Sequence, residues 1–271
     1  MVMSASAAMS VYDITRQKGK NMFDFDSLED QELARRVFEE AKAFLGMCHF
    51  GVQGIHRTEE DYLAVVNRLK ATKMAPLAFD AEMQFIPFLR EVFSDYCCPV
   101  KLHCAVSYPM GRMLPVTKMK TIDHLRTIGV DDICVCLDWE AVFSGNYGKI
   151  EEEARMITNE FQNDFYRVAF VLPATLMSDT KIIDTCKALD AAGIVSIKVN
   201  PGAKLGVSFE EVNLIQRKFP NRFDIHASGN IRTLSDILRY REMGLNNIHT
   251  ASALDCTEEF VMMKLKEYGG I

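Results

Sequence analysis

Short apolar runs alternate with amphipathic segments along most of the chain. From residue 22 onward, eight runs rich in β-branched and aromatic residues predict strands. They are 22–26, 76–80, 101–107, 131–137, 167–172, 194–199, 223–227 and 247–251. Between these runs apolar residues recur at helical spacing, as at Leu33, Val37 and Ala41. The chain is therefore expected to alternate strand and helix, most regularly in its C-terminal two thirds.

Residues that typically begin and end helices support this order. Ser208 and Thr233 each precede a helical pattern with acidic residues in the first turn, as N-cap residues do. Gly129, Gly193 and Gly244 each follow a predicted helix, where a left-handed backbone is common. The boundaries of the later elements are thus predicted from both ends.

The predicted strands are apolar almost throughout, which is typical of a parallel sheet covered by helices. Eight strand–helix units favour an α/β fold of the (β/α)₈ TIM-barrel type, and a doubly wound open sheet is the alternative. Residues 1–20 are expected to form a flexible tail, and 21–271 a single barrel domain. The stretch 46–73 is expected to be an insertion that carries its own helix, at about 58–71.

Composition excludes several classes of protein. The 271 residues include 31 Lys and Arg against 37 Asp and Glu, a net charge of −6 that argues against a nucleic-acid partner. No apolar stretch approaches the roughly 20 residues that span a membrane, and the first residues do not form a secretory signal. The eight cysteines are therefore expected to be free thiols of a cytoplasmic protein.

Lys198 is the most informative candidate for chemistry. It lies between a predicted strand and the turn Pro201-Gly202, at the strand end where barrel proteins place their active sites. An amine desolvated there favours Schiff-base formation with a carbonyl group. The alternative is a structural lysine that pairs with a neighbouring carboxylate.

Three stretches around this lysine resemble the deoxyribose-phosphate aldolase family, the class I aldolases on a TIM barrel. They are 193–202 (GIVSIKVNPG), 224–233 (DIHASGNIRT) and 248–252 (IHTAS). In order and separation they are similar to the family's Lys-x-x-x-Gly, Lys-x-x-Gly-Gly-x-Arg-Thr and Gly-x-Ser-Ser signatures. The resemblance covers roughly residues 75–255.

The resemblance implies cleavage of 2-deoxyribose 5-phosphate to acetaldehyde and glyceraldehyde 3-phosphate through a Schiff base on Lys198. It also implies a phosphate site at Gly202, Gly229, Asn230 and Ser252. No cofactor is expected.

Two positions depart from the family pattern. His226 stands where the family has a second lysine, and Cys134 stands where it has the proton-relay aspartate. Lys198 would then rely on burial alone to lower its pKa, and a Cys134 thiol in apolar surroundings would relay protons poorly. Because each general acid–base contribution is worth roughly 10² to 10⁴ in rate, we expect weak or absent aldolase activity.

The leading interpretation is thus a divergent, aldolase-like protein that acts in binding or as a scaffold. An acidic protein partner such as actin is one expectation, since aldolases as a class bind it. Three basic clusters would provide the surface: Arg68, Lys70 and Lys73; Arg112, Lys118 and Lys120; and Arg217, Lys218 and Arg222.

Two alternatives stay open at this point. One is an active class I aldolase in which His226 moves the proton. The other is a sensor of a sugar phosphate or small carbonyl compound, in which Lys198 forms a Schiff base that does not turn over. No metal is expected, because His226 and His249 are placed at neighbouring strand ends without a third ligand, and the cysteines lack zinc spacing.

Overall fold

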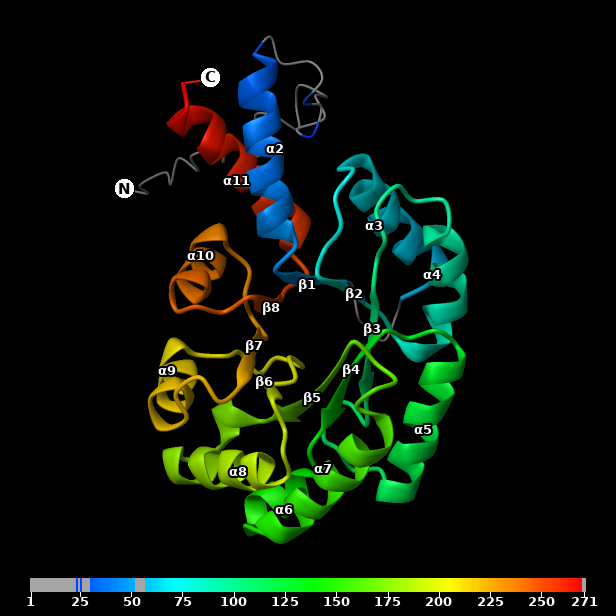
Figure 1. Ribbon diagram of the computed structural model, residues 1–271, viewed down its shortest axis with the longest axis vertical. Helices are drawn as coiled ribbons and strands as arrows, with labels where there is room; N and C mark the ends of the chain where they lie inside the picture. The colour runs from blue at the N-terminus through cyan, green and yellow to red at the C-terminus, as the bar shows by residue number, and fades with distance from the viewer. Residues whose placement is uncertain (1–22, 24, 26–29, 52–56, 270–271) are drawn as a thin grey trace, which may run out of the picture.

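Eight parallel strands close into a barrel in the order of the sequence, β1 to β8, in a computed structural model that describes residues 23, 25, 30–51 and 57–269 (Figure 1). The strands are β1 (Cys48–Phe50), β2 (Ala78–Asp80), β3 (Leu102–Val106), β4 (Asp132–Cys136), β5 (Arg167–Leu172), β6 (Ser196–Val199), β7 (Asp224–Ser228) and β8 (Asn247–His249). The (β/α)₈ prediction is confirmed, and the open-sheet alternative is wrong because β1 pairs with β8.

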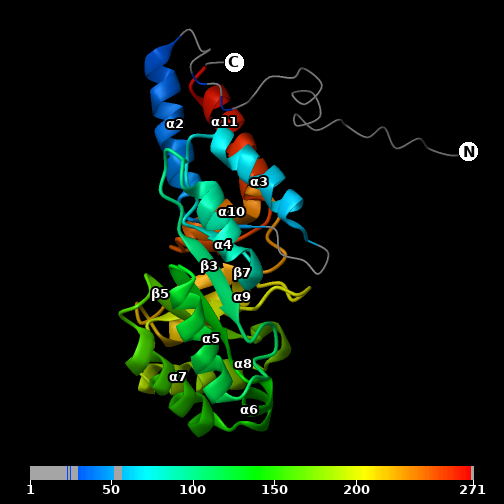
Figure 2. The same ribbon diagram turned by 90° about the vertical axis from the view of Figure 1, so that its right-hand side faces the viewer.

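Helices surround the barrel wall and cover it from outside (Figures 1 and 2). They are α2 (Gln31–Leu45), α3 (Glu59–Ala71), α4 (Ile86–Phe93), α5 (Pro115–Thr127), α6 (Trp139–Ser144), α7 (Tyr147–Phe161), α8 (Asp179–Ala191), α9 (Phe209–Lys218), α10 (Leu234–Glu242) and α11 (Ala253–Glu267), with short 3₁₀ turns at Met83–Phe85 and Ala174–Leu176.

The first barrel strand differs from the prediction. Residues 23 and 25 are not in a strand, and 22, 24 and 26 lie outside the described residues, as does the expected tail 1–20. The stretch 46–73 supplies β1 and α3, so it is part of the barrel and not an insertion. The additional helix is α2, which precedes β1. A strand of only three residues is too short to show a strand periodicity in the sequence. The apolar run at 22–26 shows that periodicity and was therefore predicted as the first strand.

The helix boundaries follow the predicted signals. Ser208 caps α9 in a capping box with Glu211, and the Thr233 side chain accepts a hydrogen bond from the Asp236 amide at the start of α10. Gly129 and Gly193 have φ values of 86° and 82° after α5 and α8, in the left-handed region that favours glycine. The sequence signals for helix ends are thus confirmed.

The helix α2 packs along α11, outside the junction of β1 with β8 (Figure 1). Phe44 and Phe260 stack with ring centroids 4.6 Å apart. At the C-terminal end of α11, the Tyr268 hydroxyl donates to Glu40 of α2 at 2.7 Å. The helix before the first strand is therefore anchored to the helix after the last one.

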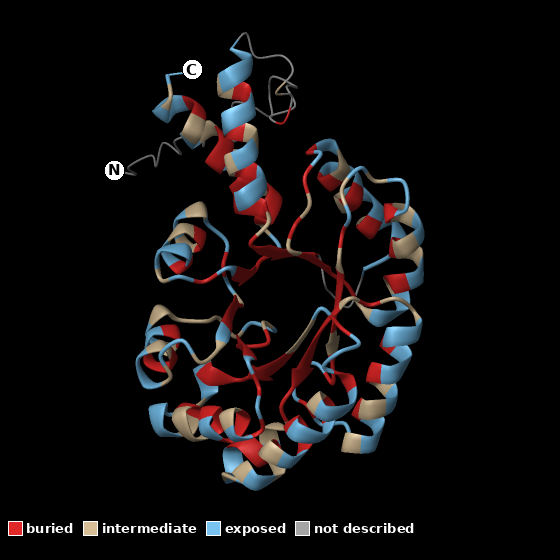
Figure 3. Ribbon diagram, in the orientation of Figure 1, coloured by how far each residue is buried: buried red, intermediate tan, exposed pale blue. Residues whose placement is uncertain are grey.

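The apolar core lies between the barrel wall and the helices, as the buried strands in Figure 3 show. A second and much smaller apolar cluster lies inside the barrel, formed by Cys134, Cys136, Ala169 and Val171 with Ala105. All eight cysteines are unpaired, as expected. Among the described residues no helix combines the length and apolar character needed to cross a bilayer.

Candidate active site

The interior of the barrel is unusually polar. Barrels normally fill this space with branched apolar side chains. Here alternate positions of the strands place titratable side chains inside, because successive side chains of a strand point to opposite faces. The buried polar set includes His49, Asp80, His103, Asp132, Ser196, Lys198, His226, Asn247 and His249. Such groups are costly to bury unless they bind one another or a ligand.

Lys198 reaches this interior from β6. Its side chain is buried, and Nζ lies 3.1 Å from His249 Nδ1 and 4.0 Å from Cys134 Sγ. It lines a cavity of about 180 Å³ at the carboxyl ends of the strands, together with Tyr108 and Asp80. The structure thus places the predicted nucleophile at a barrel mouth that small molecules can enter.

The electrostatics of this lysine differ from the expectation. Burial alone would lower the pKa of Lys198, but the negative charges of Cys134 and Asp80 outweigh it, and the pKa lies above its ordinary value. Burial would likewise raise the pKa of Cys134, but Lys198 and His103 outweigh it and the pKa is lowered. Cys134 therefore lies between the small apolar cluster inside the barrel and two basic side chains, Lys198 and His103, which favour its thiolate form.

His226 occupies the same interior but does not touch Lys198 directly. Its Nδ1 lies 3.1 Å from His249 Nε2, and its Nε2 lies 2.9 Å from Ser196 Oγ and 2.9 Å from an Arg167 nitrogen. Burial lowers the pKa of His226 to about 3, so the ring is neutral. His249, from β8, is therefore the residue that stands between the predicted nucleophile and the predicted proton shuttle.

Asp80 gathers three of the histidines around one carboxylate. The Nδ1 atoms of His103 and His49 lie 2.8 Å and 3.5 Å from Asp80 Oδ1, and His249 Nδ1 lies 3.2 Å from Oδ2. The rings of His49 and His249 stack at 3.8 Å. Burial would lower the pKa of His103, but the Asp80 charge outweighs it and raises this pKa to about 10.

Sequence reasoning missed this cluster. Its four members come from four strands, β1, β2, β3 and β8, so no spacing along the chain marks them. The short strand β1 was also placed elsewhere, which hid His49. One signal was available, because Asp80 and His103 lie in predicted strands as polar residues within apolar runs. His249 groups with His49, Asp80 and His103 as candidate ligands, whereas His226, the partner expected from the sequence, is not in this group.

The predicted phosphate residues are only partly brought together. Gly202, Gly229 and Asn230 line the cavity beside Lys198, whereas Ser252 is the N-cap residue of α11 and is not part of the lining. Arg232, which was not among the predicted site residues, lines the cavity as well. A guanidinium group is a strong partner for phosphate or carboxylate.

Gly229 is required by its surroundings. Its φ is 92°, and a Cβ at this position would lie 2.0 Å from the carbonyl oxygen of Leu205. Any side chain would force the loop after β7 away from the loop after β6. This glycine therefore keeps the two loops close at the cavity rim.

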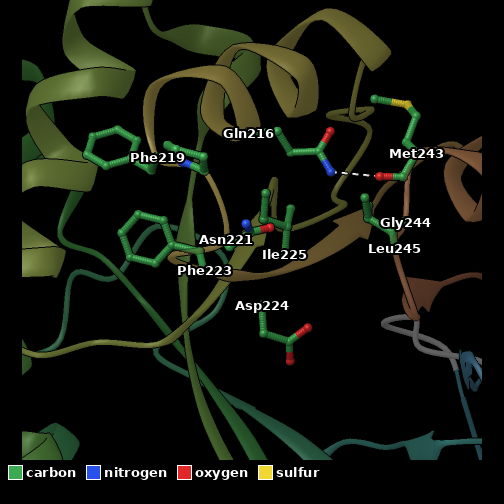
Figure 4. Close-up of a pocket in the computed structure, with 10 residues that line it drawn as sticks. Gln216, Phe219, Asn221, Phe223, Asp224, Ile225, Met243, Gly244 and Leu245 are labelled. Atoms are coloured by element: carbon green, nitrogen blue, oxygen red, sulfur yellow. Dashed lines mark hydrogen bonds between the residues drawn. The ribbon is translucent and has the colours of Figure 1, made fainter.

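A second hollow, of about 290 Å³, lies at the opposite end of the barrel (Figure 4). It surrounds the start of β7 at Asp224 and the segment before β8, and the Gln216 amide donates to the Met243 carbonyl at 2.8 Å beside it. Active sites of barrel enzymes lie at the carboxyl ends of the strands, where Lys198 is found. The cavity at Lys198 is therefore the candidate active site.

The expected basic surface clusters are altered by the fold. Lys118 is fully buried, with Nζ 2.5 Å from Glu153 Oε1 and 3.0 Å from the Cys136 carbonyl oxygen. Arg68 forms ion pairs with two acidic side chains of α11, Asp255 and Glu258, at 2.8 and 3.3 Å. Lys118 is therefore not part of a surface patch, since it balances a buried carboxylate, whereas Arg112 and Lys120 of the same cluster are exposed.

A closed parallel barrel with a buried lysine at the carboxyl end of β6 defines a (β/α)₈ barrel protein with a candidate site at that end. Curated relatives show which proteins the chain is similar to. The chain is 28% identical over 179 residues to the deoxyribose-phosphate aldolase of Caldicellulosiruptor saccharolyticus, covering 64% of this chain and 80% of the relative. It is 27% identical over 180 residues to that of Aquifex aeolicus, covering 66% and 81%. The chain is thus similar to deoxyribose-phosphate aldolases over about two thirds of its length and diverges from them in sequence.

Solved structures agree on the fold. The aldolase QR15 superimposes with a TM-score of 0.74 at 21% identity, over 84% of this chain and 98% of its own. The deoxyribose phosphate aldolase of Aeropyrum pernix gives 0.72 at 18% identity, over 85% and 99%. No protein-family model matches the chain.

Proposed function

We propose that the chain captures a small carbonyl compound as an imine on Lys198, and that it cleaves 2-deoxyribose 5-phosphate at least about 100-fold more slowly than an intact family member. The observation that carries the proposal is the position of Lys198 Nζ at the cavity, 4.0 Å from a thiol where the family has an aspartate. The nucleophile is kept, and the group that would move protons for carbon–carbon cleavage is replaced.

Imine formation needs little beyond what the site contains. The Lys198 ammonium first gives one proton to the Cys134 sulfur, a transfer that the raised pKa of Lys198 opposes, and the free amine then attacks the carbonyl carbon. The carbonyl oxygen then leaves as water, and its protons come from the amine and from the same thiol. The short contact to His249 Nδ1 holds the amine in the cavity during this exchange.

The size of the cavity favours a short carbonyl compound. Its volume of about 180 Å³ lies below the roughly 300–1,000 Å³ of pockets for larger ligands. His249 stands where the resemblance places a glycine, so an imidazole ring fills space that the family leaves open. Arg232 and Asn230 at the rim would bind an anionic end of the compound.

Borohydride trapping tests the proposal. The protein is incubated with acetaldehyde and, separately, with 2-deoxyribose 5-phosphate, reduced with borohydride, and mapped by mass spectrometry beside Lys198→Arg. Retro-aldol turnover is measured in parallel with an intact family member. A reduced adduct on Lys198 with turnover at background supports the proposal. Unmodified Lys198 overturns it.

A second candidate function is an active aldolase in which histidines replace the missing groups. A continuous set of contacts favours it: Lys198 to His249 at 3.1 Å, His249 to His226 at 3.1 Å, and His226 to Ser196 at 2.9 Å. Two neutral imidazoles in series can pass a proton. Turnover within about tenfold of the intact family member would establish this candidate and overturn the first.

A further inference from the structure

Three imidazole nitrogens converge on one carboxylate at the floor of the cavity. His49, His103 and His249 each turn Nδ1 toward Asp80, and the ligand atoms of the four residues all lie within 4.8 Å of one another. The four residues come from β1, β2, β3 and β8, so rigid barrel strands hold them.

Hydrogen bonding accounts for only part of this convergence. His103 Nδ1 pairs with Asp80 Oδ1 at 2.8 Å, but His49 is 0% exposed and neither of its ring nitrogens forms a hydrogen bond with the described residues. Buried polar atoms without partners are rare and costly in native proteins. His249 Nδ1 faces a donor, Lys198 Nζ, at 3.1 Å and an acceptor, Asp80 Oδ2, at 3.2 Å. One nitrogen atom cannot satisfy both in a single protonation state.

We propose that His49, Asp80, His103 and His249 bind a divalent transition-metal ion, Zn²⁺ above all, in a tetrahedral site of three imidazoles and one carboxylate. Nitrogen ligands with one carboxylate oxygen are a set that Zn²⁺ takes up at about 2.0–2.1 Å. Ligand atoms on such an ion lie about 3.3 Å apart, so the four side chains need to approach one another by about 1.5 Å at most.

The outer nitrogens of the histidines are placed as in known metal sites. A metal-bound imidazole commonly turns its second nitrogen to a carboxylate or another partner, which fixes the ring. His49 Nε2 lies 3.9 Å from Asp132 Oδ2, and His249 Nε2 lies 3.1 Å from His226. His103 is hydrogen-bonded to Cys134. His249 is thus held by a contact outside the ligand set, whereas His49 Nε2 has only the more distant Asp132 carboxylate.

This inference goes beyond the proposed function and concerns a different event. Lys198 lies at the edge of the ligand set and is not one of the four ligands. The metal site is tested without any carbonyl compound, and the imine is tested in protein dialysed against EDTA. Either proposal can therefore fail alone.

Zinc binding is measured by calorimetry on EDTA-dialysed protein in which Cys97 and Cys98, thiols outside the barrel, are both changed to Ser. We expect one Zn²⁺ per chain and an increase in Tm on binding. Asp80→Asn and His103→Asn should each weaken binding at least about 100-fold. His124→Asn, at an exposed histidine of α5, is the matched control and should bind as the parent does.

Cobalt replaces zinc as a spectroscopic probe, so that the outcome does not depend on whether the variants fold. We expect the visible absorption of tetrahedral Co²⁺ with one ion per chain, and no thiolate-to-cobalt charge-transfer band. No stoichiometric binding of either ion, or binding that Asp80→Asn and His103→Asn leave unchanged, overturns the proposal. A thiolate charge-transfer band overturns it as well, because it would place the ion on Cys134.

Discussion

Lys198 on β6 and His249 on β8 meet inside the barrel, with Nζ 3.1 Å from Nδ1. The two strands are not neighbours, since β7 lies between them. The contact therefore crosses over β7 and brings the lysine of the aldolase-like signature against an imidazole ring from β8. Because the same nitrogen also faces Asp80, the amine is linked to a carboxylate and two further histidines.

Restoring the aspartate of the family pattern should restore turnover. Cys134→Asp places a carboxylate close to Lys198 Nζ, where the thiol now lies at 4.0 Å. We expect the retro-aldol rate on 2-deoxyribose 5-phosphate to rise by about 10²-fold, the lower end of a general acid–base contribution. Cys136→Asp, the same change two residues along the strand, is the control. Equal rates for Cys134→Asp and the parent would show that the missing aspartate does not limit the reaction.

The buried ion pair of Lys118 with Glu153 should dominate the stability of the α5–α7 contact. Lys118→Met leaves the Glu153 carboxylate buried without its partner, which costs about 3–5 kcal/mol of unfolding free energy. Adding Glu153→Leu should recover most of this loss, because the pair is then replaced by apolar groups. Urea unfolding of both variants and the parent measures the two values. A double variant as unstable as Lys118→Met would contradict the argument.

Asp138 should contribute stability that depends on pH. Burial would raise its pKa, but the Lys149 ammonium at 2.7 Å and the Glu140 amide outweigh it, and the pKa is lowered. A carboxyl group whose pKa is lower in the folded state stabilises above its unfolded pKa, near 3.8, and loses this contribution as the pH falls through the folded value.

The comparison with Asp138→Asn isolates this charge, since Asn caps a helix about as well as Asp. We expect the variant to lose up to about 1 kcal/mol at pH 7, the range of a partly exposed ion pair. The loss should shrink as the pH falls below 3.8. Thermal unfolding across the pH range measures it. A loss that is constant with pH would contradict the role of the charge.

Much of the fold could be predicted from local patterns, because seven of the strands are bounded by recognisable helices, glycines and caps. The strand β5 matches its predicted range of 167–172. The strand β1 could not be predicted, since its three residues Cys48–Phe50 carry too little periodicity and are fixed by pairing with β2 and β8. Long-range pairing decides such short segments.

The candidate site likewise has a part that could be predicted from the sequence and a part that could not. Lys198 was predicted because a strand, a charged residue and a turn are adjacent in the sequence. The contact between His249 and Asp80 could not be predicted, since it joins residues 169 positions apart in the sequence. The pKa directions of Lys198 and Cys134 depend on charges contributed by other strands, and a sequence does not state those distances.

The pairing of α2 with α11 closes the outside of the barrel where its strands are shortest. The strands β8, β1 and β2, which are neighbours in the barrel, have only three residues each. His49 and His249 project from that part of the wall, and the stacked rings of Phe44 and Phe260 hold the two helices together behind it. The paired positions of His49 and His249 inside the barrel are thus supported by the packing of α2 on α11 outside it. The contact of α2 with α11 thus lies behind the two strands that carry these histidines.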